Sequence, residues 1–257
     1  MPKRNYIKGM VFAALFAALT AAVSPIKIPL GFTPVPITLQ TLMVLLAGAL
    51  LGANLGALSQ FLYLLVGALG LPVFAGGGSG FGALLGPTGG YLLSYPIAAF
   101  VIGKILEKKK LNLFLKYASF VIMIILILIV AIDLILKIGI IKLWDAASSG
   151  YLPMVSLLSG QQRLILIIIS IVVIAIPLFV VLYLKRSKVF STDVILAMFA
   201  GTLLIYLLGS VQGKFVTGLP WGAIFVGWVL PFLVGDTIKL LIAAYIAKTV
   251  DIKKYMR

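Results

Sequence analysis

The sequence contains no cysteine and no histidine, and these two absences exclude several kinds of chemistry. Without cysteine the chain can form no disulfide, no thiol nucleophile and no cysteine-based zinc cluster. Without histidine it lacks the commonest general base and a common haem ligand. We therefore expect a protein without a metal centre and without a bound cofactor.

Acidic residues are also scarce, since six Asp and Glu stand against 21 Lys and Arg and give a formal net charge of +15. This charge does not indicate nucleic-acid binding, because the basic residues form short clusters between long apolar runs instead of one polar face. Hydrophobic residues make up 63% of the chain and charged residues 11%, against roughly half and a quarter in soluble domains. The composition predicts an all-α integral membrane protein.

Eight apolar stretches are expected to cross the membrane as helices. They are residues 6–24, 37–51, 55–69, 92–106, 113–136, 164–184, 194–208 and 221–247. The second and third are short for a hydrocarbon core about 30 Å thick, which indicates tilting, kinking or shielding by protein. The first has no clear signal-peptidase site, so we expect it to be retained as a helix.

The basic residues are distributed unevenly between the two sides of the membrane. If the N-terminus lies inside, fifteen of the 21 Lys and Arg residues fall in inner segments and one, Lys239, lies within the eighth stretch. The outer segments hold the remaining five, which are Lys27, Lys137, Lys142, Arg163 and Lys214. This bias predicts eight spans with both termini in the cytoplasm.

Asp236 and Lys239 stand out because both lie inside the eighth apolar stretch. A charge near the membrane centre costs about 2.5–3.5 kcal/mol. At a spacing of three the two side chains share one helix face and can contact each other or one ligand. A carboxylate and an ammonium together suit an amide-like or ureido-like ligand with an acidic tail. The alternative is a structural ion pair that joins two helices.

Residues 71–91 contain eight glycines, which are too many for a membrane-spanning helix and predict a structured loop. Glycines allow a close approach of backbone to ligand and expose N–H donors. A tight turn without any ligand is the alternative.

Alanines recur at four-residue spacing along the first apolar stretch, in two rows. The rows are Ala13, Ala17 and Ala21, and Ala14, Ala18 and Ala22. Small residues at this spacing form a smooth surface for another helix, which belongs either to the same chain or to a partner. Gln40 and Gln60 are expected to form hydrogen bonds between helices unless they face a ligand.

Three stretches carry a resemblance to a known family. They are GFTPVPITLQT at residues 31–41, GALGLPVFAGG at 67–77 continuing into GPTGGY at 86–91, and GDTIK at 235–239. Together they resemble the BioY family, the biotin-binding S component of energy-coupling-factor (ECF) transporters. The resemblance covers about residues 6–107 and 190–248.

The resemblance implies a six-helix membrane bundle that binds biotin toward the outer face, beneath the loop between the third and fourth helices. It implies that Asp236, Lys239 and Gln40 contact the vitamin, and it places Gly78, Ser79 and Tyr91 in the same site. It also implies that Ala13, Ala17 and Ala21 dock the ECF transmembrane coupling protein. Two ATP-binding-cassette ATPases would supply the energy.

The sequence departs from the family pattern in three places. Gly78 stands where some members carry Asn, and Leu92 stands where some carry Arg. The polar contacts of that Asn and that Arg are expected to be absent or to be replaced by Ser79, Thr88 or backbone groups. The larger departure is an insertion of about residues 108–189, with two extra spans. The expected organisation is residues 1–107 and 190–257 as the two parts of the core, with the insert between them.

We therefore expect high-affinity biotin uptake by a substrate-binding subunit of an ECF-type ABC transporter in the cell membrane. One alternative is an S-type carrier for another vitamin or a biotin precursor. An intramembrane enzyme, such as a lipid phosphatase or acyltransferase, is disfavoured because the chain lacks histidine and any dense polar cluster. A channel is disfavoured because a single span carries a central charged pair.

Overall fold

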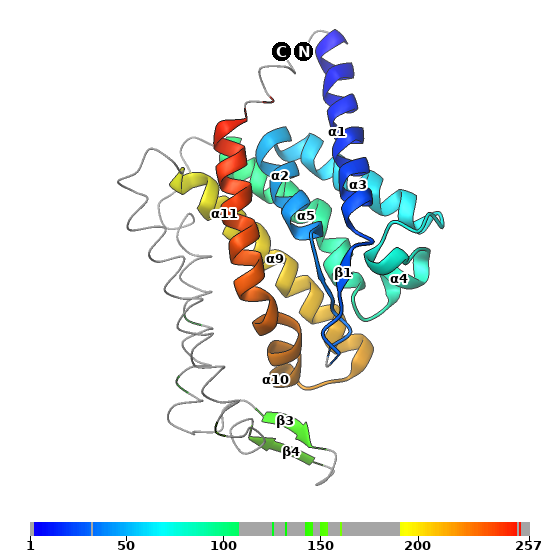
Figure 1. Ribbon diagram of the computed structural model, residues 1–257, viewed down its shortest axis with the longest axis vertical. Helices are drawn as coiled ribbons and strands as arrows, with labels where there is room; N and C mark the ends of the chain where they lie inside the picture. The colour runs from blue at the N-terminus through cyan, green and yellow to red at the C-terminus, as the bar shows by residue number, and fades with distance from the viewer. Residues whose placement is uncertain are drawn as a thin grey trace.

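The computed structural model describes residues 3–31, 33–107, 142–145, 150–153 and 191–250, together with the single positions 125, 132, 160 and 252. This part of the chain is mostly helical (Figure 1). In order, its elements are α1 (Lys3–Val23), β1 (Lys27–Ile28), β2 (Ile37–Thr38), α2 (Gln40–Leu51), α3 (Ala53–Ala68), η1 (Ala75–Gly77), α4 (Phe81–Leu85), α5 (Gly89–Glu107), β3 (Lys142–Asp145), β4 (Gly150–Pro153), α9 (Thr192–Thr217), α10 (Trp221–Ile224), η2 (Phe225–Val229), η3 (Leu230–Phe232) and α11 (Leu233–Thr249).

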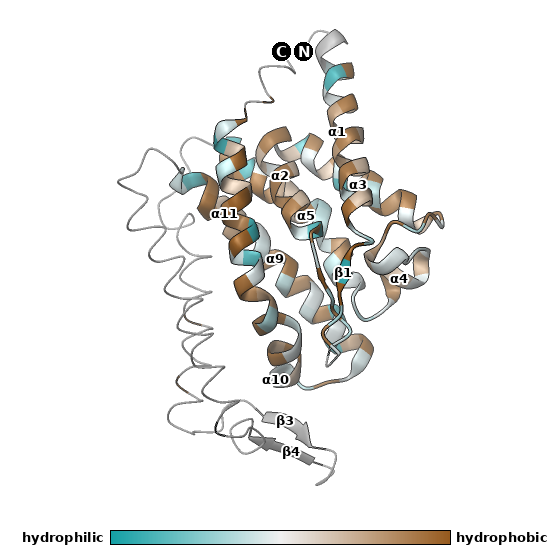
Figure 2. Ribbon diagram, in the orientation of Figure 1, coloured by the Kyte–Doolittle hydropathy of each residue, from teal (hydrophilic) through white to brown (hydrophobic). Residues whose placement is uncertain are grey.

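Four helical segments in the described residues are long and apolar enough to cross a membrane. They are Tyr6–Val23, Gly89–Glu107, Thr192–Thr217 and Trp221–Thr249, and the last contains α10 to α11. The helices α2 and α3 are apolar but shorter, with 12 and 16 residues. Figure 2 shows hydrophobic residues along most turns of these helices. The chain is therefore a multi-pass membrane protein, as its composition predicts.

The two spans predicted at residues 113–136 and 164–184, and with them the helices of the proposed insert, lie outside the described residues apart from the single positions 125 and 132. The count of eight spans therefore stays a prediction. The start of α1 and the end of α11 lie at the same end of the bundle (Figure 1).

Helix α5 packs against α2, α3 and α9, and α1 covers α3 and α2 on the outside of the bundle. Glycines permit the closest approaches. A Cβ on Gly103 of α5 would collide with the backbone of Ala53 at the start of α3, and one on Gly90 would collide with the Leu208 carbonyl of α9. Small residues at such crossings allow helix backbones to approach closely in a membrane.

The second predicted span begins later than expected, because its first two residues form strand β2. This strand pairs antiparallel with β1, with Lys27 opposite Thr38 and Ile28 opposite Ile37. The pairing occupies backbone groups that a helix starting at Ile37 would leave without partners at its first turn. A short β-hairpin between α1 and α2 is the result, so the fold is mostly but not entirely helical.

Helix α9 continues well beyond residue 208, where the seventh predicted span ends, and ends only at Thr217. Its glycines are contact positions, since the ring of Trp228 fills the space where Gly213 would carry a Cβ. The helix ends where Gly218 adopts a left-handed conformation with φ of 70°, which is a common way for helices to end.

The eighth predicted span is interrupted ahead of its charged pair. The π-helical turn η2 and the 3-10 turn η3 separate α10 from α11. Pro231 in η3 lacks a backbone N–H and cannot continue regular helical bonding. Such π-turns frequently occur at functional sites, and α11, which carries Asp236, begins at Leu233, directly after η3.

The glycine-rich stretch forms a structured connection, as predicted, with two short helical turns. These turns are η1 and α4. The following helix starts at Gly89, three residues earlier than expected, so Gly89, Gly90 and Tyr91 belong to α5.

Candidate functional site

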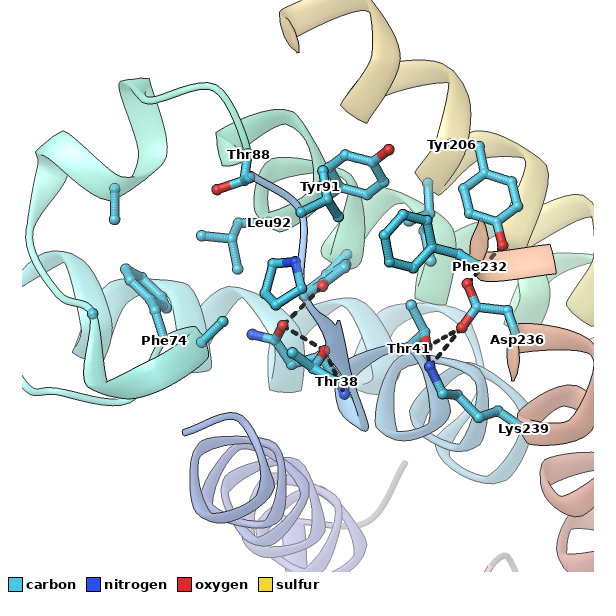
Figure 3. A pocket seen from close by; sticks show the side chains of 18 residues that line it. Thr38, Thr41, Phe74, Thr88, Tyr91, Leu92, Tyr206, Phe232, Asp236 and Lys239 are labelled. Atoms are coloured by element: carbon cyan, nitrogen blue, oxygen red, sulfur yellow. Dashed lines mark hydrogen bonds and ion pairs between the residues drawn. The ribbon is translucent and has the colours of Figure 1, made fainter. Parts of the chain in front are cut away.

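A cavity lies where α2, α5, α9 and α11 meet β2 and the glycine-rich connection (Figure 3). About 120 Å³ of it is open to the centre of a water molecule. A single water needs about 10–15 Å³ on this measure, so the cavity has room for a ligand. Its apolar lining consists of Val35, Pro36, Phe74, Ala75, Gly78, Ala83, Leu92, Ile205 and Phe232. Its polar lining consists of Thr38, Gln40, Thr41, Thr88, Tyr91, Tyr95, Tyr206, Asp236 and Lys239.

Asp236 and Lys239 form an ion pair at the α11 side of the cavity. Lys239 Nζ lies 2.7 Å from Asp236 Oδ1, and the two residues are only 6% and 8% exposed, with Asp236 the more buried. Thr41 donates to the same oxygen at 3.0 Å, and Tyr206 donates to Asp236 Oδ2 at 2.6 Å. Thr41 also accepts a bond from Lys239 at 3.3 Å. Helices α2, α9 and α11 thus meet at one carboxylate.

The hydrogen bonds of this pair leave few of its donor and acceptor sites free. A carboxylate has about four acceptor sites, and Asp236 uses three of them within the described residues. An ammonium has three N–H donors, and Lys239 uses two. One acceptor site, on Asp236 Oδ2, and one donor, on Lys239 Nζ, therefore remain. That combination matches an N–H next to a C=O, as in an amide or a cyclic urea.

Gln40 forms a second polar centre at the start of α2, and it is also buried. Its Nε2 donates to the Tyr63 hydroxyl at 2.6 Å, while its Oε1 accepts from Thr38 at 2.9 Å and from Tyr95 at 3.3 Å. Tyr63 in turn donates to the Val73 carbonyl at 3.1 Å. The network fixes the amide of Gln40 at the cavity wall and links α2, α3 and α5.

Tyr91 contributes its ring to the wall of the cavity (Figure 3), but its hydroxyl is bonded to a backbone carbonyl outside the lining. The hydroxyl donates to the Trp228 carbonyl at 2.7 Å. That carbonyl belongs to the π-turn η2, where regular helical bonding is disturbed. Tyr91 therefore holds the segment leading to α11 against α5.

Hydrogen bonds to α9 and α3 hold the glycine-rich connection in place, besides those of its own turns. Gln212 of α9 donates to the carbonyls of Leu84 and Gly86 at 2.8 and 2.9 Å. Gly80 N–H donates to the Gly67 carbonyl at 2.7 Å. These bonds hold the connection over the cavity between α3 and α9.

Comparison with known proteins assigns the chain to a family. The BioY family model matches residues 1–187 and 168–255. The chain belongs to the BioY family. Among curated relatives, the probable biotin transporter BioY of Pyrococcus horikoshii is 50% identical over 96 residues, which are 37% of this chain and 58% of the relative. The biotin transporter BioY of Thermotoga maritima is 46% identical over 104 residues, which are 40% of this chain and 60% of that one.

The matches to these two BioY relatives therefore cover somewhat less than two thirds of each relative's length. A crystal structure of the S-component for biotin from an ECF-type ABC transporter superposes with a TM-score of 0.60 at 23% identity. The match covers 97% of this chain and 93% of that one. This BioY-family chain therefore has the S-component fold.

Most of the predicted site residues of this BioY-family chain come together. Asp236, Lys239, Gln40, Gly78 and Tyr91 all line the cavity. Ser79, which was expected beside them, is exposed and is not part of the lining. The neighbouring Gly78 meets the cavity with backbone only, and Leu92 meets it as an apolar side chain.

Sequence reasoning missed Thr41 and Tyr206 as partners of Asp236. Thr41 ends the 31–41 stretch that carries the family resemblance, so a signal for it existed. Tyr206 lies in an ordinary apolar run, and only its contact across the helix interface identifies it.

The expected docking surface on α1 needs a correction. Ala13 and Ala17 are 0% and 8% exposed and lie among the residues of the core, so they pack within the chain and are not open to a partner. Ala21 is partly buried. The second row is the outward one, because Ala14, Ala18 and Ala22 are exposed.

Proposed function

We propose that this chain is the biotin-binding membrane subunit of an ECF-type ABC transporter and that it serves high-affinity biotin uptake. Its curated relatives are named as biotin transporters, and its fold is that of an S component. The single observation that carries the proposal is the buried Asp236–Lys239 pair, with one acceptor and one donor left over. The ureido ring of biotin offers the matching N–H and C=O.

In the proposed complex the ureido ring lies against α11, where Asp236 accepts from a ring N–H and Lys239 donates to the ring oxygen. The apolar wall, with Phe232 and Leu92, covers the sulfur-containing ring. Nanomolar binding requires about −12 kcal/mol. Apolar burial supplies much of this free energy, and the polar pair sets the specificity.

The proposed partners are the transmembrane coupling protein and two ATP-binding-cassette ATPases of an ECF transporter. The outward row Ala14, Ala18 and Ala22 on α1 is the surface that we assign to the coupling protein, because it combines exposure with the required spacing. The arrangement further proposed is a six-helix core with two helices inserted at residues 108–189, both termini in the cytoplasm and the plasma membrane as location.

Equilibrium binding of radiolabelled biotin to the purified chain in detergent tests the ligand assignment. Unlabelled biotin, dethiobiotin, riboflavin and thiamine serve as competitors. Dethiobiotin keeps the ureido ring but lacks the sulfur ring, so it is expected to compete more weakly than biotin, and the other two vitamins are expected not to compete. Stronger competition by dethiobiotin would favour a carrier for a biotin precursor. A failure of the chain to bind biotin at all would overturn the proposal.

Transport itself is tested in a biotin-auxotrophic bacterial host. The chain is expressed with and without coupling protein and ATPases, and uptake of labelled biotin at nanomolar concentration is measured. Uptake that rises when the partners are present supports the proposed assembly. Equal uptake with ATPases inactivated at their Walker lysine would exclude a role for these partners.

A further inference from the structure

The two charges that line the cavity neutralise each other. Asp236 and Lys239 are joined at 2.7 Å, and their other bonds go to neutral hydroxyls. They lie on one side of the cavity, while Phe74 and the glycine-rich connection lie on the other (Figure 3). A ligand with its polar ring at Asp236 therefore directs its tail toward the glycine-rich connection, where the lining residues carry no charge.

Lys27 lies against the glycine-rich connection but is not part of the cavity lining. The side chain of Lys27 lies across Gly76, since a Cβ on Gly76 would collide with Cδ, Cε and Nζ of Lys27. Ala75, directly before Gly76, and Gly78, two residues after it, line the cavity. The ammonium of Lys27 is thus separated from the cavity by a wall made of small residues.

The position of Lys27 is fixed from two directions. Its backbone is paired with Thr38, another lining residue, in the β1–β2 hairpin. Two residues earlier, the carbonyl of Pro25 accepts a bond from Gly76 N–H at 3.2 Å. The hairpin and the glycine-rich connection are therefore joined where the Lys27 side chain crosses, and Lys27 as a whole is exposed.

Gly76 is required for this arrangement. It has a φ of +69°, which L-residues with side chains rarely adopt, and it has no room for a Cβ beneath the lysine. A glycine at this position lets the ammonium approach the wall more closely than any other residue would.

From these observations, and resting on the proposed function, we infer that Lys27 attracts the acidic tail of the ligand electrostatically, across the thin wall formed by the glycine-rich connection. It supplies the positive charge that the cavity lining lacks at this side, and it thereby sets a preference for ligands that end in a carboxylate. Lys214, another cation on the outer side, donates to the Gly218 carbonyl beyond the end of α9 at 3.3 Å.

The test compares biotin with biotinamide, whose tail is neutral but otherwise similar, by equilibrium binding to the purified chain. Lys27→Met removes the charge and keeps an apolar stem, Lys27→Arg keeps the charge, and Lys214→Met is the matched control. Lys27→Met is expected to weaken biotin binding roughly 3- to 10-fold, as for a partly solvated ion pair, and to leave biotinamide binding unchanged. Lys27→Arg and Lys214→Met are expected to behave as wild type with both ligands.

Two results would overturn the inference while leaving the proposed function intact. An equal loss for biotin and biotinamide in Lys27→Met would show that the lysine only supports the loop, and no loss for either would show that it does not sense the tail. Wild-type protein that binds neither ligand would instead overturn the proposed function and this inference with it.

Discussion

Replacing Asp236 by asparagine tests the centre of the site with almost no change in shape. The substitution removes the negative charge and turns one of two acceptor oxygens into a donor. Lys239, only 8% exposed, then lacks its counter-charge. The three donors that now surround the carboxylate, from Lys239, Thr41 and Tyr206, cannot all be satisfied by one amide oxygen.

The size of the effect follows from these contacts. Removing one partner of a buried ion pair costs about 3–5 kcal/mol of stability. A hydrogen bond between a ligand N–H and the charged carboxylate contributes about 1.5–3 kcal/mol. Its loss corresponds to roughly 10- to 150-fold weaker biotin binding. Asp236→Asn is therefore expected to lower both the melting temperature and the affinity.

A double variant separates the two effects. Asp236→Asn combined with Lys239→Met removes both charges, so it is expected to recover much of the stability that Asp236→Asn loses but not to recover biotin binding. Thermal unfolding in detergent and equilibrium binding of labelled biotin are measured on the same preparations. Asp193→Asn, an exposed carboxylate in the first turn of α9, is the control. Wild-type affinity in Asp236→Asn would refute the role assigned to the carboxylate.

Three further substitutions test features around the site. Gly213→Ala forces a methyl group into the ring of Trp228. It is expected to lower the stability by about 1–3 kcal/mol, which is measured as a lower melting temperature. Gly227→Ala is the control and is expected to be nearly neutral, because a Cβ there meets nothing within 4 Å. Gln212→Ala removes the two bonds from α9 to the glycine-rich connection and is expected to speed biotin release in a dilution assay. An unchanged release rate would contradict a covering role. Tyr206→Phe deletes one hydrogen-bond donor to the Asp236 carboxylate. It is expected to weaken biotin binding severalfold, which corresponds to about 1 kcal/mol. Unchanged binding would show that the hydroxyl does not contribute.

The membrane class and most helices follow directly from the sequence, because apolar runs of sufficient length have one stable form in lipid. The positions of the helix ends do not follow so directly. The seventh span is predicted to end at residue 208, whereas α9 continues to Thr217, and Gly213 within this extension is the place where Trp228 packs against the helix. Strand β2 was predicted as helix because its pairing with β1, ten residues earlier, leaves no mark on local hydropathy.

The sequence likewise predicts some residues of the candidate site and not others. Asp236 and Lys239 are visible in the sequence because charges within an apolar run are costly and rare. The sequence does not show which alanine row on α1 faces the core. Ala13 and Ala14 begin two rows of the same spacing, and only the packing of α1 on its neighbours shows which row is buried and which is exposed. Tyr206 likewise becomes a site residue only through a contact that spans 30 positions.

The shortness of α3 has a consequence for the surrounding lipid. Its 16 residues extend about 24 Å at 1.5 Å per residue, and Phe61 and Leu65 are exposed on it. A hydrocarbon layer about 30 Å thick exceeds this length by roughly 6 Å, and such a mismatch costs fractions of a kcal/mol per Å. Helix α9, with 26 residues, is long enough for the full layer. Lipids with shorter acyl chains are therefore expected to match α3 better, while α9 accommodates thicker bilayers.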